Sequence, residues 1–255
     1  MTAARGFEGR VAVVTGGSRG LGRAIAGGLA REGATVVVAS RDAARCAAVA
    51  EELRAASGRE AVGIGCHVGR WADCDRLVDA VQQRYGRLDV LVNNAGMSPL
   101  YDGLGGVTEE LFDKVLAVNL KGPFRLSVRA AELMTEAGKG SIVNVTSIAA
   151  VRPAAHQVPY ALAKAGLSAL TVAMAHACGP AIRVNAVMAG PFRTDASRGW
   201  DQAAFAERAR RDIPLRRAGE PEEIVGAVLH LAGDAASYTS GAVLKVDGGE
   251  AWSTS

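Results

Sequence analysis

The sequence predicts an α/β fold in which seven parallel strands form one doubly wound sheet with helices on both faces. Three observations support this fold. Strand-like and helix-like patterns alternate along the whole chain. The strand-like runs are apolar throughout, as strands buried on both faces require. The first of them leads into a glycine-rich turn that opens a helix. Because no linker, repeat or low-complexity stretch interrupts the alternation, we expect a single domain over residues 1–255.

Seven short runs are expected to be strands. They are rich in β-branched residues and show no polar alternation, which is typical of a parallel sheet covered on both sides. In chain order they are Val11–Val14, Thr35–Ala39, Ala61–Val68, Leu88–Asn93, Ser141–Val145, Ile182–Val187 and Ala242–Val246.

The segments between these strands have helical periodicity or helix start and stop signals. Thr108 is a capping residue, Pro123 is expected to bend or interrupt the helix that follows, and Gly179-Pro180 is a stop signal. The expected helices are Leu21–Arg31, Asp42–Ser57, Trp71–Tyr85, Thr108–Met134, Val158–Ala177 and Glu220–Ala232.

Two irregular segments follow strands, at about residues 98–106 and 190–212. The first contains three glycines and a proline. Open α/β sheets bind ligands beyond the carboxyl ends of their strands. We therefore expect both segments to be loops that contact the substrate.

The composition indicates a packed core and gives no electrostatic reason for binding nucleic acid or a membrane surface. Of 255 residues, 49% are hydrophobic and 22% are charged, and the net charge is only +3. No apolar run approaches the roughly 20 residues that a membrane helix needs. The nine residues before the first strand leave no room for a signal peptide. We expect a cytoplasmic protein.

The four cysteines are expected to be free thiols rather than metal ligands. They form no C-x-x-C pair, and no histidines join them at metal-ligand spacing. No metal site is therefore predicted. The cysteines are Cys46, Cys66, Cys74 and Cys178.

The first strand is followed by a turn with glycines at positions 16, 20 and 22. Glycines let the backbone turn tightly and approach a pyrophosphate, and the helix N-terminus then offers unpaired N–H groups. The same glycines would also fit a purely structural turn, but the position between the first strand and first helix favours phosphate binding. The expected contacts are Gly16, Ser18, Arg19, Gly20, Leu21 and Gly22.

The spacing Thr15-Gly-x-x-x-Gly-x-Gly22 resembles the short-chain dehydrogenase/reductase family, in particular its 3-oxoacyl-reductase-like members. Four further motifs extend the resemblance over essentially the whole chain, and their joint order and spacing are highly specific. They are Asn93-Asn-Ala-Gly96, the internal Asn119, Ser147 with Tyr160-x-x-x-Lys164, and Asp247-Gly-Gly249. The resemblance implies a Rossmann-like domain that binds a nicotinamide dinucleotide.

Tyr160 and Lys164 are four residues apart on one predicted helix and therefore share a face. A nearby ammonium is expected to lower the pKa of the phenol, which suits general acid–base work on an alkoxide. Ser147 could polarise the same substrate oxygen. Without the other motifs, a core tyrosine beside a snorkelling lysine and a strand-end serine capping a turn would be the simpler interpretation. The resemblance further implies that Lys164 binds the nicotinamide ribose and that Asn119 holds a water relaying protons to Lys164.

The end of the second strand predicts NADP(H) rather than NAD(H). The position where NAD-binding sheets place an acidic residue is Ser40, and Arg41 follows it. Arg19 in the glycine turn would face the same corner, and two guanidiniums suit a 2′-phosphate. The alternative is two ordinary surface arginines, with Asp42 capping the next helix.

Two positions depart from the family pattern. His67, followed by Val68, stands where an aspartate usually bonds the adenine amino group. His67 could accept that bond, stack on adenine, or be a strand-end histidine satisfied locally. The loop after the sixth strand has Ala189-Gly190 in place of Pro-Gly, so carboxamide contacts are expected from Gly190, Phe192 and Thr194. The resemblance places Asn94, Ala95 and Gly96 beside the adenosine ribose.

The sequence thus predicts an NADP(H)-dependent oxidoreductase that reversibly reduces a ketone or aldehyde, with Tyr160 as proton donor. The substrate could be a 3-oxoacyl thioester or a small or polyketide carbonyl. A dinucleotide-binding protein without catalysis, and an isomerase or dehydratase on the same fold, are the alternatives. The helix around 162–177 is apolar on more than one face, which indicates a homotetramer or homodimer.

Overall fold

A computed structural model of the chain describes residues 6–195 and 201–252. Seven parallel strands form one sheet, as the sequence predicts, and their order is β3-β2-β1-β4-β5-β6-β7. The strand order reverses between β1 and β4. The strands are β1 Val11–Thr15, β2 Thr35–Ser40, β3 Ala61–Gly65, β4 Val90–Asn93, β5 Gly140–Ser147, β6 Ile182–Ala189 and β7 Val243–Val246.

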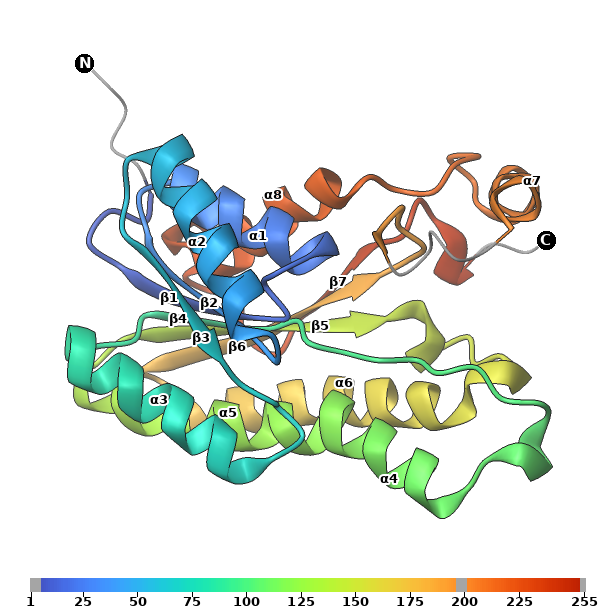
Figure 1. Ribbon diagram of the computed structural model, residues 1–255, viewed down its shortest axis with the longest axis horizontal. Coiled ribbons are helices and arrows are strands. Elements are labelled where there is room, and N and C mark those ends of the chain that lie inside the picture. Colours follow the sequence, from blue (N-terminus) through green and yellow to red (C-terminus); the bar gives the residue numbers. More distant parts are fainter. Residues whose placement is uncertain (1–5, 196–200, 253–255) are drawn as a thin grey trace.

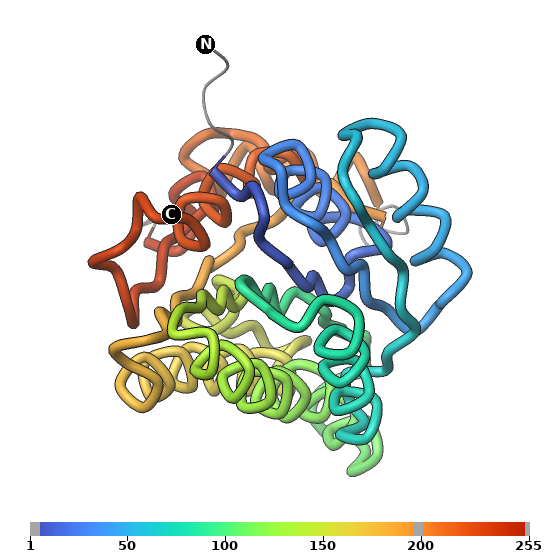
Figure 2. The backbone as a smooth tube through the Cα atoms, turned by 90° about the vertical axis from the view of Figure 1, so that its left-hand side faces the viewer, coloured from blue at the N-terminus to red at the C-terminus, as the bar shows by residue number. Residues whose placement is uncertain are grey.

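Helices cover both faces of the sheet (Figure 1). Helices α1, α2 and α8 lie on one face, and α3, α5 and α6 lie on the other, so that the sheet is enclosed between two layers (Figure 2). The helices are α1 Gly20–Arg31, α2 Ala43–Ser57, α3 Trp71–Tyr85, α4 Glu109–Leu116, α5 Gly122–Glu136, α6 Val158–Cys178, α7 Gln202–Asp212 and α8 Val225–Ala232.

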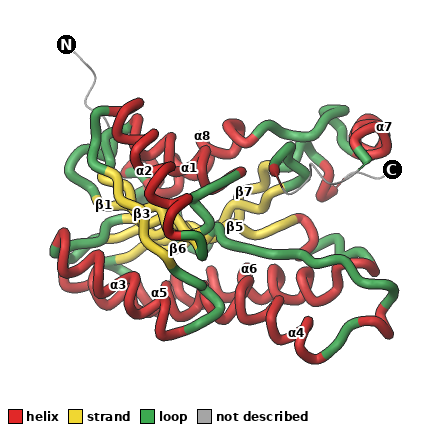
Figure 3. Tube along the Cα trace, viewed as in Figure 1, coloured by secondary structure: helices red, strands yellow, loops and turns green. Residues whose placement is uncertain are grey.

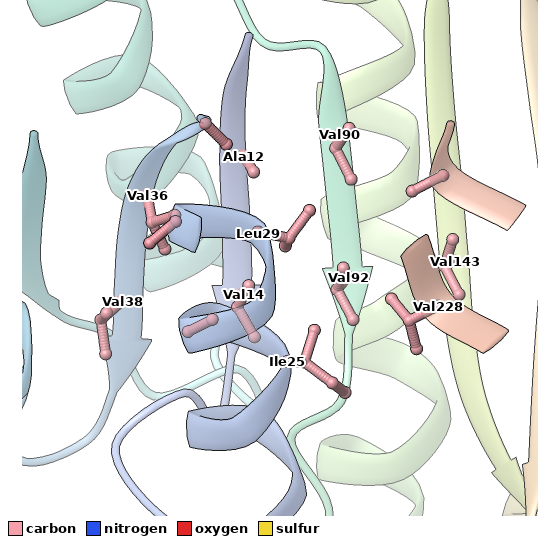
Figure 4. Close-up of a cluster of buried hydrophobic side chains, with 14 of the residues drawn as sticks. Ala12, Val14, Ile25, Leu29, Val36, Val38, Val90, Val92, Val143 and Val228 are labelled. Atoms are coloured by element: carbon pink, nitrogen blue, oxygen red, sulfur yellow. The ribbon is translucent and has the colours of Figure 1, made fainter. Parts of the chain in front are cut away.

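The core consists of two apolar clusters, one on each face of the sheet. Figure 4 shows the first, in which Ile25 and Leu29 of α1 lie against valines of the central strands. Both side chains are fully buried. Burial of a side chain of this size contributes about 1.5–3 kcal/mol. This packing fixes α1, and hence the turn before it, on the centre of the sheet.

The expected third strand, 61–68, ends earlier than predicted. β3 stops at Gly65, after which the Cys66 N–H still bonds Ser40 O at 2.8 Å. The His67 N–H then turns to the carboxylate of Asp73 at 3.0 Å. Cys66 and Val68 are buried in this turn. Their apolar side chains therefore made the sequence pattern of the strand look longer than the strand is.

The expected helix over 108–134 is interrupted at Ala117–Lys121, just before Gly122-Pro123 rather than at it. Thr108 caps α4 by accepting a hydrogen bond from the Leu111 N–H at 3.2 Å, as predicted. A π-helical turn at Ala117–Lys121 then separates α4 from α5, and Pro123 lies in the first turn of α5. Proline is common in the first turn of a helix, where its fixed φ already suits the helical backbone.

The segment 190–212, expected to be a loop, is a helix in its last part. Helix α7 begins after Asp201, whose side chain accepts hydrogen bonds from the N–H groups of Ala203 and Ala204. Phe205 and Ala209 are the buried residues of this helix, and they lie on one face of it. Figure 3 shows α7 at the periphery, away from the two main helix layers. Residues 196–200 of the expected loop lie outside the described part of the chain.

Two further helices differ in detail from the prediction. The expected helix 220–232 begins with a 3₁₀ turn at Pro221–Ile224, closed by a capping box between Glu220 and Glu223. The segment Ala155–Cys178, which contains α6, is long and apolar enough to cross a membrane by length and composition alone. This is weak evidence for a span, because a core helix passes the same test, and α6 packs on β5 and β6.

Candidate active site

The glycine turn is held against the segment after β4 at the point where the strand order reverses. A Cβ atom on Gly16 would lie 2.8 Å from Asn94 Nδ2, and one on Gly22 would lie 2.4 Å from it. Gly16 also has a φ of +64°, which favours glycine. These two glycines are therefore required by the close approach of the segment after β4. Their predicted approach to a pyrophosphate stays a prediction.

Thr15 joins β1 to the same segment. Its Oγ1 donates to Val92 O at 3.2 Å and accepts from the N–H groups of Asn94 and Ala95 at 3.0 and 3.1 Å. The Asn94 side chain donates back to Thr15 O at 2.9 Å. These hydrogen bonds hold Asn94 and Ala95 against the glycine turn at the edge of the site. The Asn94 side-chain amide therefore has a structural role. Thr15 belongs to the glycine motif, but the motif alone did not predict this role for its hydroxyl.

The start of α1 has the features of a phosphate-binding site. The residue that caps it, Arg19, makes no side-chain cap hydrogen bond, so the first N–H groups of a twelve-residue helix are free for an anion. A Cβ on Gly20 would lie 3.3 Å from Thr194 Cβ, which places Thr194 over this turn. Asp195 then pairs with Arg45 of α2 at 3.7 Å. The residues present fit a dinucleotide pyrophosphate.

The corner between the turn and β2 contains the predicted cofactor-selecting residues. Ser18 Oγ donates to Ser40 Oγ at 2.9 Å, which joins the turn to the strand end. Asp42 accepts from the Arg45 N–H at 2.9 Å and caps α2, so it fulfils the capping role considered for it. Arg19 and Arg41 are exposed, and neither forms an ion pair within residues 6–195 and 201–252.

His67 is satisfied locally. Its Nδ1 accepts a hydrogen bond from the Gly69 N–H at 3.2 Å. A nitrogen that accepts from a backbone N–H carries no proton, so the proton of the neutral ring is on Nε2, which is a donor. The geometry therefore favours the strand-end histidine among the alternatives, and it disfavours His67 as acceptor of the adenine amino group.

Three of the predicted cofactor contacts have their side chains in the apolar core. Leu21 packs against the cluster beneath α1, Val68 belongs to the cluster on the other face, and the Phe192 ring is 8% exposed. Only their backbone atoms can face a ligand. Phe192 forms a parallel bridge with Gly219 that uses the neighbouring Pro191 O and Arg193 N–H. The bridge leaves the N–H and C=O of Phe192 itself unused.

Gly190 and Gly96 keep side chains out of crowded places. A Cβ on Gly190 would lie 2.6 Å from the backbone of Asp247, so the chain can pass the end of β7 only with glycine here. A Cβ on Gly96 would lie 2.9 Å from Asn119 Oδ1 and 3.7 Å from Lys164 Nζ. Gly96 therefore leaves the space between Asn119 and Lys164 free of a side chain.

Asn119 is fully buried in the π-helical turn. Its Nδ2 donates to Met97 O at 2.8 Å and Val115 O at 2.9 Å, and its Oδ1 accepts from the Met97 N–H at 3.2 Å. The side chain thus fixes the start of the segment after β4. π-Turns inside helices frequently mark functional sites. This π-turn is a structural sign of the site that the sequence did not reveal.

Ser147 and Tyr160 meet at the carboxyl end of β5. Ser147 Oγ accepts from the Ala149 N–H at 3.2 Å, so it caps the following turn and is held in place. Its hydroxyl also faces Tyr160 and acts to lower the pKa of that phenol. The capping role considered for Ser147 is therefore present, and its polarisation of a substrate oxygen stays a prediction.

Lys164 is 3% exposed, and its Nζ donates to Val145 O at 2.7 Å. The Nζ lies 5.7 Å from the centre of the Tyr160 ring. Burial lowers the pKa of Lys164 to about 8. The ammonium is thus desolvated and aimed at the end of β5, one turn from the tyrosine.

The expectation that Lys164 lowers the pKa of Tyr160 is wrong for this structure. Burial raises the pKa of Tyr160 and outweighs the opposing hydrogen bond from Ser147. The physical reason is that both groups lie out of water, so each is shifted toward its neutral form. At neutral pH the phenol carries its proton.

A buried polar network behind the site was not anticipated. Asn93 Nδ2 donates to Ser127 Oγ and Asn144 Oδ1, both at 2.9 Å, and Asn144 Nδ2 donates to Thr171 Oγ1 at 2.9 Å. All four side chains are at most 1% exposed. Buried polar groups need such partners, and these join β4 and β5 to α5 and α6. The side chains thereby set how α6 lies against the strand ends.

Known proteins share this arrangement. A family model described as "Enoyl-(Acyl carrier protein) reductase" matches residues 16–250. The "Granaticin polyketide synthase putative ketoacyl reductase 2" of Streptomyces violaceoruber is 43% identical over 245 residues, covering 95% of this chain and 96% of that protein. A short-chain type dehydrogenase/reductase from Mycobacterium marinum has a TM-score of 0.91 at 31% identity, covering 98% of each chain.

This chain belongs to the short-chain dehydrogenase/reductase family. It is an oxidoreductase of a family that binds a nicotinamide dinucleotide and acts on small molecules. An NADPH-dependent 3-quinuclidinone reductase from Rhodotorula rubra is also similar in structure, with a TM-score of 0.90, 30% identity, and coverage of 97% of this chain and 93% of that one.

The buried ammonium predicts an unusual pH dependence of stability. The pKa of Lys164 is about 8 in the folded chain and 10.5 in the unfolded chain. Above about pH 8 the unfolded state binds more protons, so stability rises with pH. Relative to Lys164→Met, the wild type should gain about 2 kcal/mol of unfolding free energy between about pH 7 and about pH 9.5. Urea unfolding at both pH values measures this, with the exposed Lys114→Met as control. An equal change in wild type and Lys164→Met would show that the ammonium is not desolvated.

Proposed function

We propose that the chain is an NADP(H)-dependent carbonyl reductase that uses Tyr160 as its proton donor. The observation that carries this proposal is the convergence of Ser147, Tyr160 and Lys164 at the carboxyl end of β5, beside the glycine turn. A dinucleotide-binding protein without catalysis would need the turn but not these three groups.

The nicotinamide, when bound, supplies or accepts the hydride. Tyr160 gives its phenolic proton to the substrate oxygen as that oxygen gains negative charge. Ser147 donates a hydrogen bond to the same oxygen, a stabilisation that acts only where charge develops. Lys164 is positioned to bind the nicotinamide ribose and to stabilise the phenolate that remains. The proton is replaced from solvent through a water beside Lys164 and the turn that contains Asn119.

The raised pKa of Tyr160 disfavours the phenolate that alcohol oxidation would need at neutral pH. Reduction needs the protonated phenol, and burial keeps the proton on it. Oxidation of an alcohol needs the phenolate and should therefore gain more from a rise in pH.

The substrate is proposed to be a ketone or aldehyde bound between the segments 98–106 and 190–212, within a single domain over residues 1–255. A shallow surface depression next to Tyr160 is lined by Pro99, Leu111, Val115 and Pro159, among others. Its apolar lining suits the carbon chain next to a carbonyl. The named ketoacyl reductase makes a 3-oxoacyl thioester or polyketide carbonyl the first substrates to test.

Replacing Tyr160 with Phe should lower the rate of carbonyl reduction by about 10²–10⁴-fold, since only the proton donor is lost. NADPH binding, followed by nicotinamide fluorescence, should be preserved. Tyr238→Phe, which removes a fully exposed hydroxyl, is the matched control. Turnover close to wild type in Tyr160→Phe would refute the mechanism. Formation of an isomerised or dehydrated product without NADPH oxidation would instead indicate the alternative chemistry on this fold.

The preference for NADP(H) over NAD(H) is proposed from the corner at Ser18 and Ser40. The strand end has a hydroxyl where an acidic residue would repel a 2′-phosphate, and the neighbouring carboxylate of Asp42 caps α2. Arg19 and Arg41 are exposed beside it. Charge-assisted hydrogen bonds to phosphate contribute about 1.5–3 kcal/mol each where they are partly desolvated.

Together the two arginines should make NADPH bind roughly two or more powers of ten more tightly than NADH. The double change Ser40→Asp with Arg41→Ala should reverse the preference, because the new carboxylate accepts the free ribose hydroxyl and repels the phosphate. Titration of both proteins with both cofactors measures this, and Arg31→Ala, at the far end of α1, is the control. Equal binding of NADH and NADPH by the wild type would mean that the arginines are ordinary surface residues.

A homotetramer or homodimer is proposed from the uncovered apolar surface of α6. Leu162 and Val172 are 53% and 43% exposed, and Phe124 of α5 is 42% exposed. A groove of about 780 Å³ runs between α4, α5 and α6, lined mainly by apolar and small residues such as Leu120, Ala169 and Ala173. A second copy of the chain would cover this surface from the opposite side of a two-fold axis.

A carboxylate in this groove should break the oligomer without unfolding the chain. Ala169 and Ala173 are both exposed, so Ala169→Glu with Ala173→Glu leaves the core intact. Light scattering should then give the monomer mass of 26.2 kDa, against two or four times that mass for the wild type. Ala55→Glu, exposed on α2, should have no effect. A wild type that is monomeric at micromolar concentration would contradict the proposal.

A reducing, cytoplasmic environment is also proposed. All four cysteines are free thiols, and three of them are buried. Free buried cysteines without disulfides are typical of reducing compartments. Fractionation of the producing cells tests this proposal.

A further inference from the structure

Tyr101 lies in the irregular segment after β4, within the proposed substrate segment 98–106. Its hydroxyl donates a hydrogen bond to Ala155 O at 2.9 Å and accepts one from the Val158 N–H at 2.7 Å. The bonds cross 54 and 57 positions of the chain. A single phenol thus uses both its donor and an acceptor site to join this segment to the start of α6.

Val158 is the first residue of α6, and its N–H has no partner within the helix. The residue before it, Gln157, makes no side-chain cap hydrogen bond. The Tyr101 hydroxyl therefore acts as the cap, supplied from a distant part of the chain. Tyr160 follows two residues later in the same first turn, so the bond that fixes this turn also fixes the backbone of Tyr160.

The Tyr101 side chain contacts the active site on a second side. It lines the shallow depression next to Tyr160 together with Pro99. The ring and the hydroxyl thus serve different surfaces: the ring forms part of the wall next to Tyr160, and the hydroxyl holds the helix that carries Tyr160. Loss of the hydroxyl alone separates the two roles.

We propose that Tyr101 is a positioning residue that holds Tyr160 in its proton-donating place by capping α6 from the substrate segment. The proposal rests on the proposed role of Tyr160 as proton donor. Binding of substrate against segment 98–106 is thereby coupled to the placement of the proton donor. A loosened segment would leave substrate bound but poorly aligned with the phenol, and near-attack alignment is sensitive to small displacements.

The test compares Tyr101→Phe with Tyr85→Phe. Tyr85 also donates its hydroxyl to a protein oxygen, Glu60 Oε1 at 3.0 Å, but on the surface near α3, so it is a matched loss of one phenolic hydrogen bond. Tyr101→Phe should lower kcat for carbonyl reduction about tenfold, leave the NADPH dissociation constant unchanged, and speed amide hydrogen exchange at Val158. Tyr85→Phe should change none of these.

Two results would overturn the proposal. The first is faster exchange at Val158 in Tyr101→Phe with kcat within twofold of the wild type, because the cap would then not position Tyr160. The second is unchanged exchange at Val158, because the cap would then not exist in solution. Tyr101→Met, which keeps apolar bulk, repeats the test if the Phe variant folds poorly. A wild type that reduces no carbonyl would refute the proposed function instead, while the exchange measurement would still report on the cap.

Discussion

The buried ammonium of Lys164 is the constraint around which the site is organised. A charge taken out of water is stable only where polar groups surround it, and here Val145 O at the end of β5 is its partner. Gly96 leaves the space beside Nζ without a side chain, and the Asn119 turn closes the far side. The network of Asn93, Asn144, Ser127 and Thr171 then fixes α6 against the strand ends. Burial of this charge lowers the free energy of unfolding, and it places a cation beside Tyr160.

The cofactor half of the site follows from a different constraint, the close approach of backbone segments. Gly16 and Gly22 lie so near Asn94 that no side chain fits, and Thr15 joins both segments through its hydroxyl. This brings the uncapped start of α1 to the reversal point of the sheet, where open α/β sheets bind ligands. The cofactor half of the site and the half that contains Lys164 meet at residues 94–96. This stretch contacts the glycine turn on one side and the space between Asn119 and Lys164 on the other.

The sheet and most helices were predictable because burial determines which residue types occupy their positions. Continuous apolar runs identified all seven strands, and spacing identified Ser147, Tyr160 and Lys164, which the structure brings together. Helix α7 was missed because only Phe205 and Ala209 are buried on it. The π-turn at Asn119, the cap from Tyr101 and the hydrogen bond that fixes the His67 tautomer depend on contacts between distant or bent backbone segments, which no local pattern encodes. The direction of the Tyr160 pKa shift depends on burial and therefore also required the structure.

The central claim is that this edge of the sheet transfers a hydride to a carbonyl carbon and a proton to its oxygen. Incubation of the wild type with NADPH deuterated at both C4 positions and a 3-oxoacyl thioester, followed by mass spectrometry of the product, tests it most directly. The expected product is an alcohol that contains one deuterium on the former carbonyl carbon, with the hydroxyl hydrogen taken from solvent. A consumed substrate whose product carries no deuterium, or deuterium on a former C=C carbon with the carbonyl intact, would contradict it.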